Sequence, residues 1–251
     1  MNERTIEAVA ESPTPLQKSP RSVWTVMADV FIEPSRAFRA TADRPRFLIP
    51  FLVIVLVVLG QLLVTNDIRM DDLARQIRNN QTMAPEEVER RLANIEAQRS
   101  PEWHWSGLAH GLAFVTLGKG VQLLAMSAAI WLGLQFSIKR PRFRHVLAVC
   151  TLAMLIALPE AALSSALAFV KGTTDITLGP AVLLPRAWKH SPLHRLCFQI
   201  DIFTVWTMIL LIIGLPVATG VSRRLAGVTV GYLWVVWLLI AMFVGRLVQI
   251  T

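Results

Sequence analysis

Charged residues are scarce in this sequence of 251 residues: lysine, arginine, aspartate and glutamate make up 17% of it, and hydrophobic residues make up 54%. Because a soluble globular domain carries about 25% charged residues, this composition excludes an ordinary soluble protein. It indicates a membrane protein instead. A chain of this length also leaves no room for a second large folded unit beside a membrane domain.

Cysteine is nearly absent as well. Cys150 falls inside an apolar stretch and Cys197 near the start of the next one, so we expect them near opposite membrane faces. A disulfide requires Cα atoms within about 7 Å, and we therefore expect both thiols to be reduced. Residues 1–18 lack the apolar core of a signal peptide. The first apolar stretch should then start insertion and remain in the protein.

Catalytic motifs are also missing. The sequence contains no HExxH, GxSxG, GxxxxGK[ST] or helix-opening GxGxxG pattern, so we expect no enzymatic activity and no cofactor. His190, His194 and Cys197 have spacings that suit metal ligands. However, Ser191 and Pro192 predict a helix start that leaves His190 outside the helix bearing the other two. We expect interfacial hydrogen bonding there and no metal site.

Long apolar stretches take the place of these motifs. A hydrocarbon core about 30 Å thick requires about 20 apolar helical residues to cross it. Five such stretches are present: Phe47–Thr65, Trp105–Ile138, Val146–Val170, Phe198–Val221 and Leu225–Gly245. The sequence therefore predicts an all-α integral membrane protein with five transmembrane helices.

Basic clusters next to these stretches set the orientation. The formal charge is +8, but the clusters adjoin apolar stretches, so we expect contact with anionic lipid headgroups and no nucleic-acid binding. With five passes, all the clusters fall on one side, which the positive-inside rule assigns to the cytosol. We expect a cytosolic amino terminus and an outer carboxyl terminus. The clusters are Arg36, Arg39, Arg44 and Arg46; Lys139, Arg140, Arg142 and Arg144; and Arg223 and Arg224.

Three regions follow from this pattern. Residues 1–18 read as a disordered tail, residues 19–44 as a cytosolic amphipathic arm, and residues 45–250 as the membrane domain with a polar insertion at 66–104. In the arm, Ser19 and Pro20 predict a helix start. An interfacial face then follows: Val23, Met27, Val30 and Phe31 recur at helical spacing, with Trp24 alongside.

That face leaves two alternatives open: the helix lies on the membrane surface, or it packs against the bundle. In either case Pro34 is expected to end it, and Ser35 to start a second helix rich in arginine.

The polar insertion is predicted to hold two short helices, the second starting at Pro85. Its narrow apolar stripe, Val88, Leu92 and Ile95, either packs the two helices together or docks a partner. In the membrane domain, Gly107/Gly111 and Gly227/Gly231 have the spacing of closely packed helices. We expect that packing to be intramolecular.

Ionisable residues inside the apolar stretches are the strongest candidates for a polar site. Lys119 and Glu160 lie near the middle of the second and third stretches, with Asp201 and Arg246 nearer the ends of the last two. A lone charge in hydrocarbon costs several kcal/mol and therefore seeks a partner. At 1.5 Å per residue, Lys119 and Glu160 lie about 21 and 15 Å deep, within reach of one another. We expect them to pair, either as a structural ion pair or as part of a substrate or proton path.

Two sequence blocks carry a family resemblance. The first runs from Asp29 to Phe38 and continues with Arg44–Pro50; the second runs from Ile200 to Trp206 and continues with Leu211–Leu215. Over residues 22–247, the chain resembles the Yip-one (Ypt/Rab-interacting protein) domain family, especially its bacterial branch. The positions matching the family pattern are Phe31, Pro34, Phe38, Asp201, Phe203, Trp206 and Gly214.

The resemblance implies a five-pass membrane protein without enzymatic activity. Eukaryotic relatives bind small GTPases, but this chain lacks their DLYGP-like motif, which argues against GTPase binding here. We expect a membrane scaffold or accessory subunit acting in membrane organisation, trafficking or export, in contact with the bilayer and other membrane proteins in the bacterial inner membrane. The alternative is a transport-system subunit with a polar path at Lys119 and Glu160. The oligomeric state stays open.

Overall fold

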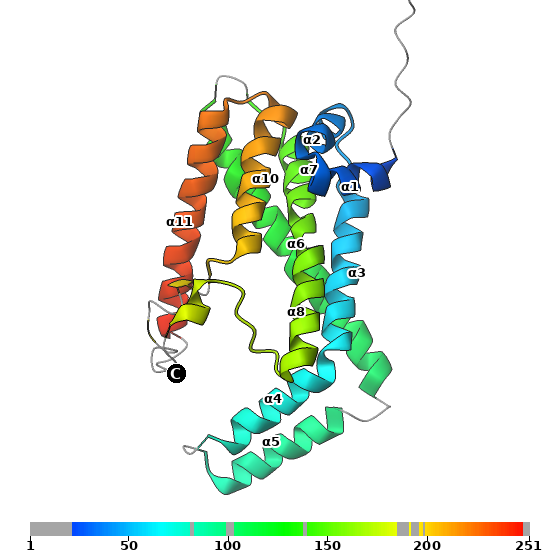
Figure 1. The fold of residues 1–251 in the computed structure, drawn as a ribbon, viewed down its shortest axis with the longest axis vertical. Helices are drawn as coiled ribbons and strands as arrows, with labels where there is room; N and C mark the ends of the chain where they lie inside the picture. Colours follow the sequence, from blue (N-terminus) through cyan, green and yellow to red (C-terminus); the bar gives the residue numbers. More distant parts are fainter. Residues whose placement is uncertain are drawn as a thin grey trace, which may run out of the picture.

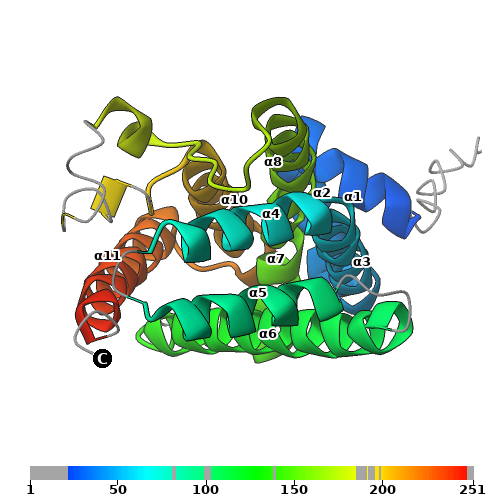
Figure 2. The same cartoon turned by 90° about the horizontal axis from the view of Figure 1, so that it is seen from below.

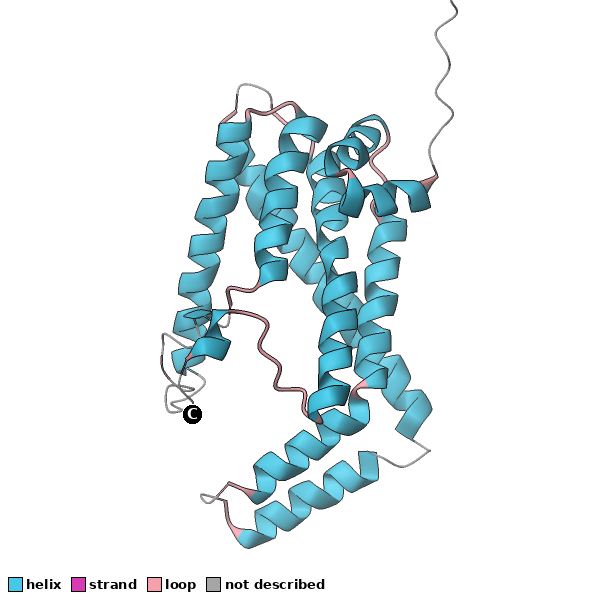
Figure 3. Cartoon of the chain, viewed as in Figure 1, coloured by secondary structure: helices cyan, strands magenta, loops and turns pink. Residues whose placement is uncertain are grey.

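The computed structural model describes residues 22–80, 83–98, 103–137, 140–184, 191, 196–197 and 199–247, and the side chains of these except 103–106, 108 and 243–247. Within this part of the chain every regular element is a helix (Figure 3). The tail predicted for residues 1–18 and the helix start at Ser19 and Pro20 lie outside it, as do His190 and His194.

The long helices run along one axis and form a bundle (Figure 1). Four described helices are long and apolar enough to cross a membrane, and there are five if α3 and α4, which meet at a bend of 55°, are counted as one. This confirms the all-α membrane fold. The bundle helices are α3 (Leu48–Val64), α6 (Trp103–Leu134), α7 (Phe143–Ala153) with α8 (Ala157–Lys171), α10 (Ile202–Thr219) and α11 (Arg223–Leu247).

The third span lies at the centre of the bundle. Every residue from Val146 to Ile156 is buried, as expected of a helix that is apolar on all sides. A 3-10 turn, η1 (Met154–Ile156), separates α7 from α8. Pro159 explains this break, because proline has no N–H to donate and its ring crowds the carbonyl of Leu155.

The outer surfaces of the bundle are apolar. On α6, for example, Phe114, Leu117 and Val121 are 79%, 69% and 64% exposed. An exposed apolar surface of this extent suits contact with lipid rather than water.

Two short helices form the arm at one end of the bundle. These are α1 (Val23–Ile32) and α2 (Pro34–Asp43). Pro34 is the first residue of α2, so the expected start at Ser35 is off by one residue. Figure 1 shows the beginnings of α7 and α11 at this same end. The described arginines of all three basic clusters therefore lie together, and we call this the basic end.

A helical hairpin covers the opposite end (Figure 2). It consists of α4 (Asn66–Arg78) and α5 (Pro85–Gln98), which confirms the two predicted helices of the polar insertion. Ile95 and Leu92 of the predicted apolar stripe pack against Met70 and Ala74 of α4. Of the two alternatives, the stripe therefore holds the two helices together. The described part of the connection between α8 and α10 includes a 3-10 turn, η2 (Pro180–Leu183).

Only one of the four paired glycines lies at a contact between described helices: a Cβ atom added at Gly111 would lie 3.7 Å from Cδ1 of Leu59 in α3. A Cβ atom added at Gly107, Gly227 or Gly231 would meet nothing within 4 Å among the described residues. The prediction of intramolecular packing is therefore wrong at these three positions. Helix α6 instead approaches α11 at Gly133, where an added Cβ would lie 2.6 Å from Cγ2 of Thr229.

Candidate functional site

The arm docks into the bundle through one buried face. Met27 and Val30 of α1 are 7% and 0% exposed, and Phe38 of α2 is fully buried. Thr41, also buried, donates a hydrogen bond from Oγ1 to the carbonyl oxygen of Ala37 at 3.0 Å, so its hydroxyl group is satisfied. The arm packs mainly on α10 and α7. We call this contact the arm–bundle contact.

A close approach in this contact joins Phe38 and Gly214. A Cβ atom added at Gly214 would lie 2.8 Å from both Cδ1 and Cε1 of Phe38. Real Cβ atoms do not approach other atoms so closely. Gly214 is thus required because the aromatic ring lies directly on the backbone of α10.

A second aromatic contact lies beside the first. Phe31 of α1 and Trp206 of α10 meet edge to face, with ring centroids 6.5 Å apart and planes at 86°. Such pairs contribute about 0.5–1.5 kcal/mol beyond the burial of their area. Pro34 occupies the first position of α2 after Glu33, where its fixed φ and missing N–H suit the start of a helix. It sets the turn between the two arm helices.

The remaining family-pattern positions shape the start of α10. Asp201 is its N-cap and accepts a hydrogen bond from the backbone N–H of Thr204 at 2.5 Å. Phe203 is 7% exposed and belongs to the main core. Span four therefore begins at Ile202 rather than at Phe198, because the Asp201 side chain caps the helix at that point.

The predicted interfacial face is divided by the structure. Val23 and Phe31 are partly buried against the core that contains Met27 and Val30, so this face packs against the bundle. Trp24, in contrast, is 65% exposed. The sequence pattern grouped Trp24 with residues that point elsewhere.

Three of the intramembrane charged residues, Lys119, Glu160 and Asp201, are linked electrostatically through Glu160. Lys119 donates a hydrogen bond to Oε1 of Gln122 on its own helix at 3.2 Å. The charges of Asp201 and Lys119 both act on the carboxylate of Glu160, which stands in the first turn of α8 after the break. A direct pair between Lys119 and Glu160 stays a prediction. The side chain of Arg246 lies outside the description.

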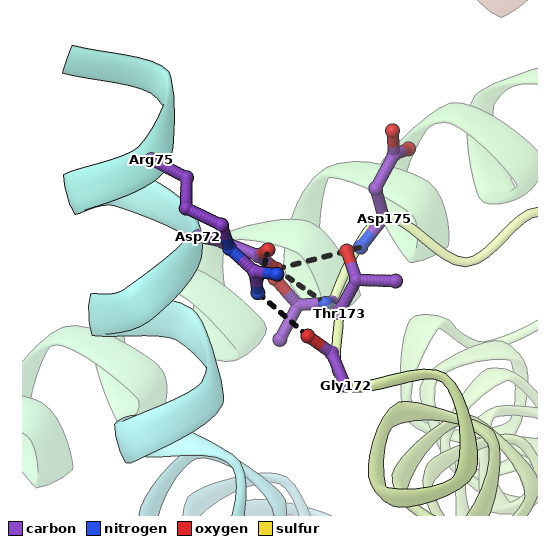
Figure 4. Close-up of polar contacts among 6 residues, drawn as sticks. Asp72, Arg75, Gly172, Thr173 and Asp175 are labelled. Atoms are coloured by element: carbon purple, nitrogen blue, oxygen red, sulfur yellow. Dashed lines mark hydrogen bonds and ion pairs between the residues drawn. The ribbon is translucent and has the colours of Figure 1, made fainter. Parts of the chain in front are cut away.

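A polar junction at the end opposite the basic end was not foreseen from the sequence (Figure 4). Asp72 of α4 accepts hydrogen bonds from the backbone N–H and the hydroxyl of Thr174, at 2.5 and 2.9 Å, and from the hydroxyl of Thr173 at 3.0 Å. Arg75 pairs with Asp72 at 2.9 Å and donates to the carbonyl oxygen of Gly172 at 2.6 Å. This junction fastens the α4–α5 hairpin to the end of α8.

The electrostatics of the junction favour an ionised Asp72. Burial raises the pKa of its carboxyl group. Hydrogen bonds from Thr174 and Thr173 and the charge of Arg75 together lower the pKa by more than burial raises it, so it lies below the ordinary value of 3.8. A sequence signal existed in Gly172, which ends α8 with a φ of 62°, as glycine commonly does after a helix. A cavity of about 430 Å³ opens beside the junction.

Metal ligation finds no support in the part of the chain that the structure describes. No group of three or more His, Cys, Asp or Glu side chains that could hold a metal ion occurs there. Cys150 and Cys197 are both free thiols, as expected, and Cys150 is buried.

Comparison with known proteins identifies the family. The model of the Yip1 domain matches residues 28–245. This chain belongs to the Yip1 domain family. The match begins within α1, ends within α11 and includes every family-pattern position described above. The contacts of Phe38 with Gly214 and of Phe31 with Trp206 therefore lie within the Yip1 domain. No curated protein and no solved structure matches the chain.

Proposed function

We propose that this Yip1 domain protein is a non-catalytic scaffold or accessory subunit that organises other proteins of the bacterial inner membrane. The observation that supports it is the arm–bundle contact. Phe38 packs on Gly214, Phe31 on Trp206, and Asp201 caps α10. Residues that carry the family pattern thus hold the arm and the bundle together. This is expected of a protein that acts by presenting fixed binding surfaces to its partners.

The proposed orientation places the arm in the cytosol. Arg142 and Arg144 at the start of α7, and Arg223 and Arg224 at the start of α11, lie at the same end as the arm. Basic residues close to the membrane are retained on the cytosolic side. The α4–α5 hairpin, fastened by Asp72, then lies outside together with the carboxyl terminus.

A partner would meet two separate surfaces in this arrangement. The arm supplies a cytosolic one, and the hairpin supplies an outer one that is held rigidly to α8. The apolar flanks of the bundle lie between them. A membrane protein that contacts both the docked arm and the hairpin would bind this chain only when the arm is docked.

The test compares two variants of the arm in native membranes. Met27→Asp places a charge in the buried face and should release the arm, whereas Thr25→Asp changes an exposed residue of the same helix. We expect membrane proteins captured by crosslinking to the wild type to be retained by Thr25→Asp and lost from Met27→Asp. Reciprocal tagging of each captured protein provides the control. The same captures from both variants would contradict a role for the docked arm.

A transport-system subunit is the second candidate. It is favoured by one observation: the charges of Lys119 and Asp201 both reach Glu160 in the middle of the bundle. In a polar path these groups would be reached by water. Single cysteines at positions 119 and 160 should then react with a charged thiol reagent in intact membranes, whereas a packed bundle would protect both.

A further inference from the structure

Helix α1 has a second apolar face that the bundle does not cover. Trp24 and Ile32 are 65% and 83% exposed, and Ala28 between them is exposed as well. Because successive helical residues turn by about 100°, these three positions lie within an arc of about 80°. We call this arc the outer face of α1.

The rest of the helix surface confirms that the outer face is distinct. Met27 and Val30 are centred about 130° away around the helix and are buried in the arm–bundle contact. The polar residues Thr25 and Asp29 form a third, narrow sector next to the outer face. A helix at the edge of a protein in water carries polar residues opposite its buried side. Here that place is taken largely by tryptophan, alanine and isoleucine.

The surroundings of the outer face are those of a lipid-facing surface. Both views place α1 beside the beginning of α3 (Figures 1 and 2). There Leu48, Leu52 and Leu56 are 59%, 47% and 63% exposed at a spacing of four residues, so they form one lipid-facing stripe of the span. Tryptophan is the residue most typical of the membrane–water boundary.

Charge next to the outer face points to the same occupant. Four arginines between the start of α2 and the start of α3 are exposed: Arg36, Arg39, Arg44 and Arg46. Basic residues near an anionic membrane surface are attracted to its headgroups. One of them, Arg36, is also paired with Glu33 at 3.1 Å, and the pair is about half exposed.

A protein partner fits the outer face less well. Complete coverage of Trp24 and Ile32 would bury about 300–400 Å², whereas a stable interface buries about 800 Å² on each partner. An interfacial helix requires only that its apolar residues enter the boundary between headgroups and acyl chains. The outer face is of the right size for that.

We propose that α1 is an interfacial helix whose outer face, Trp24, Ala28 and Ile32, inserts into an anionic leaflet while its inner face grips the bundle. This rests on the proposed orientation only in assigning that leaflet to the cytosolic side. The arm would then be held from two sides, by lipid and by protein. Its docking would depend on the composition of the membrane.

The experiment uses the full chain in nanodiscs of phosphatidylethanolamine and phosphatidylglycerol. Nitroxide labels are attached to single cysteines at positions 24, 28 and 32, after replacement of Cys150 and Cys197. Position 29 is the control, because it lies on the same helix about 100° from the middle of the outer face. We expect collisions with oxygen to exceed those with a water-soluble nickel chelate at the three outer positions, and the opposite order at position 29. Preference for the nickel chelate at all four positions would overturn the proposal, because the face would lie in water.

Protection from both reagents at the outer positions would overturn it in another way, because the face would then be covered by protein. A second measurement uses the native side chain and no label. The fluorescence lost on replacing Trp24 with Phe reports on Trp24 alone. We expect that component to be quenched by phospholipids brominated near the start of the acyl chain, and absence of quenching would refute the insertion. In nanodiscs of phosphatidylcholine alone, we expect weaker quenching of the same component.

Discussion

The contact between Phe38 and Gly214 leads to a quantitative prediction for Gly214→Ala. The new methyl group would lie 2.8 Å from two ring atoms of Phe38, and the fully buried ring has no free space to move into. Overpacking of this kind costs about 1–3 kcal/mol. The arm is the smaller of the two parts, so we expect the cost to appear as arm opening. At 1.4 kcal/mol per factor of ten, the opening population should rise about 5- to 150-fold.

Hydrogen exchange measured by mass spectrometry provides the assay. Peptides from residues 22–43 should exchange faster by that factor in Gly214→Ala, while peptides from α7 should not change. Alanine also favours a helix over glycine by about 1 kcal/mol, and Gly227→Ala measures this effect alone, because nothing lies within 4 Å of an added Cβ atom at that position. We expect the arm of Gly227→Ala to exchange at the wild-type rate.

A compensating change sharpens the test. Phe38→Leu shortens the side chain and should leave a cavity when made alone, but in Gly214→Ala it makes room for the methyl group. Contacting residues couple by about 0.5–3 kcal/mol, so the double variant should open less than the two single effects combined predict. Equal exchange in Gly214→Ala and Gly227→Ala, or strict additivity in the double variant, would refute the reasoning.

Three further predictions concern other parts of the molecule. Asp72→Asn should weaken the hairpin junction by about 1.5–3 kcal/mol, and we expect to see this as faster hydrogen exchange in α4. Folding lowers the pKa of Asp72, so its ionised carboxylate stabilises the wild type fully above pH 3.8. That stabilisation is lost as the pH falls below 3.8 through the lowered pKa. Cysteines placed within residues 66–98 should react with an impermeant reagent added to intact cells, and a cysteine at Arg142 should not. Lys119→Met and Glu160→Gln should each reduce thermal stability in detergent, by about 3–5 kcal/mol if the charges are paired, and together by less than the sum.

Each of these has an outcome that contradicts it. Unchanged exchange in the Asp72 variant, or an acid response that persists in it, would mean that the junction does not hold the hairpin. Labelling of position 142 from outside would invert the orientation. Additive effects at positions 119 and 160 would show that the two charges act independently.

The sequence by itself determined the class of the protein and most of its helices. Uninterrupted apolar stretches predict membrane helices because a backbone in hydrocarbon must satisfy its own hydrogen bonds. The same kind of local rule placed Pro85 at a helix start and Pro34 at the junction of the arm helices. These features depend on neighbours within a few residues, so a linear pattern contains the information.

Only the tertiary structure decided which residues meet. The family pattern marked both Phe38 and Gly214, but nothing in the linear order of residues shows that the ring of Phe38 lies on the backbone of Gly214. In the same way, the sequence placed Trp24 beside Met27 and Val30 in one interfacial face, because a linear pattern does not reveal which side of a largely apolar helix is covered. The contact of Asp72 with Thr173 and Thr174 joins residues about a hundred positions apart. Such contacts depend on how the spans pack, and the packing is set by the shapes of buried side chains rather than by their spacing along the chain.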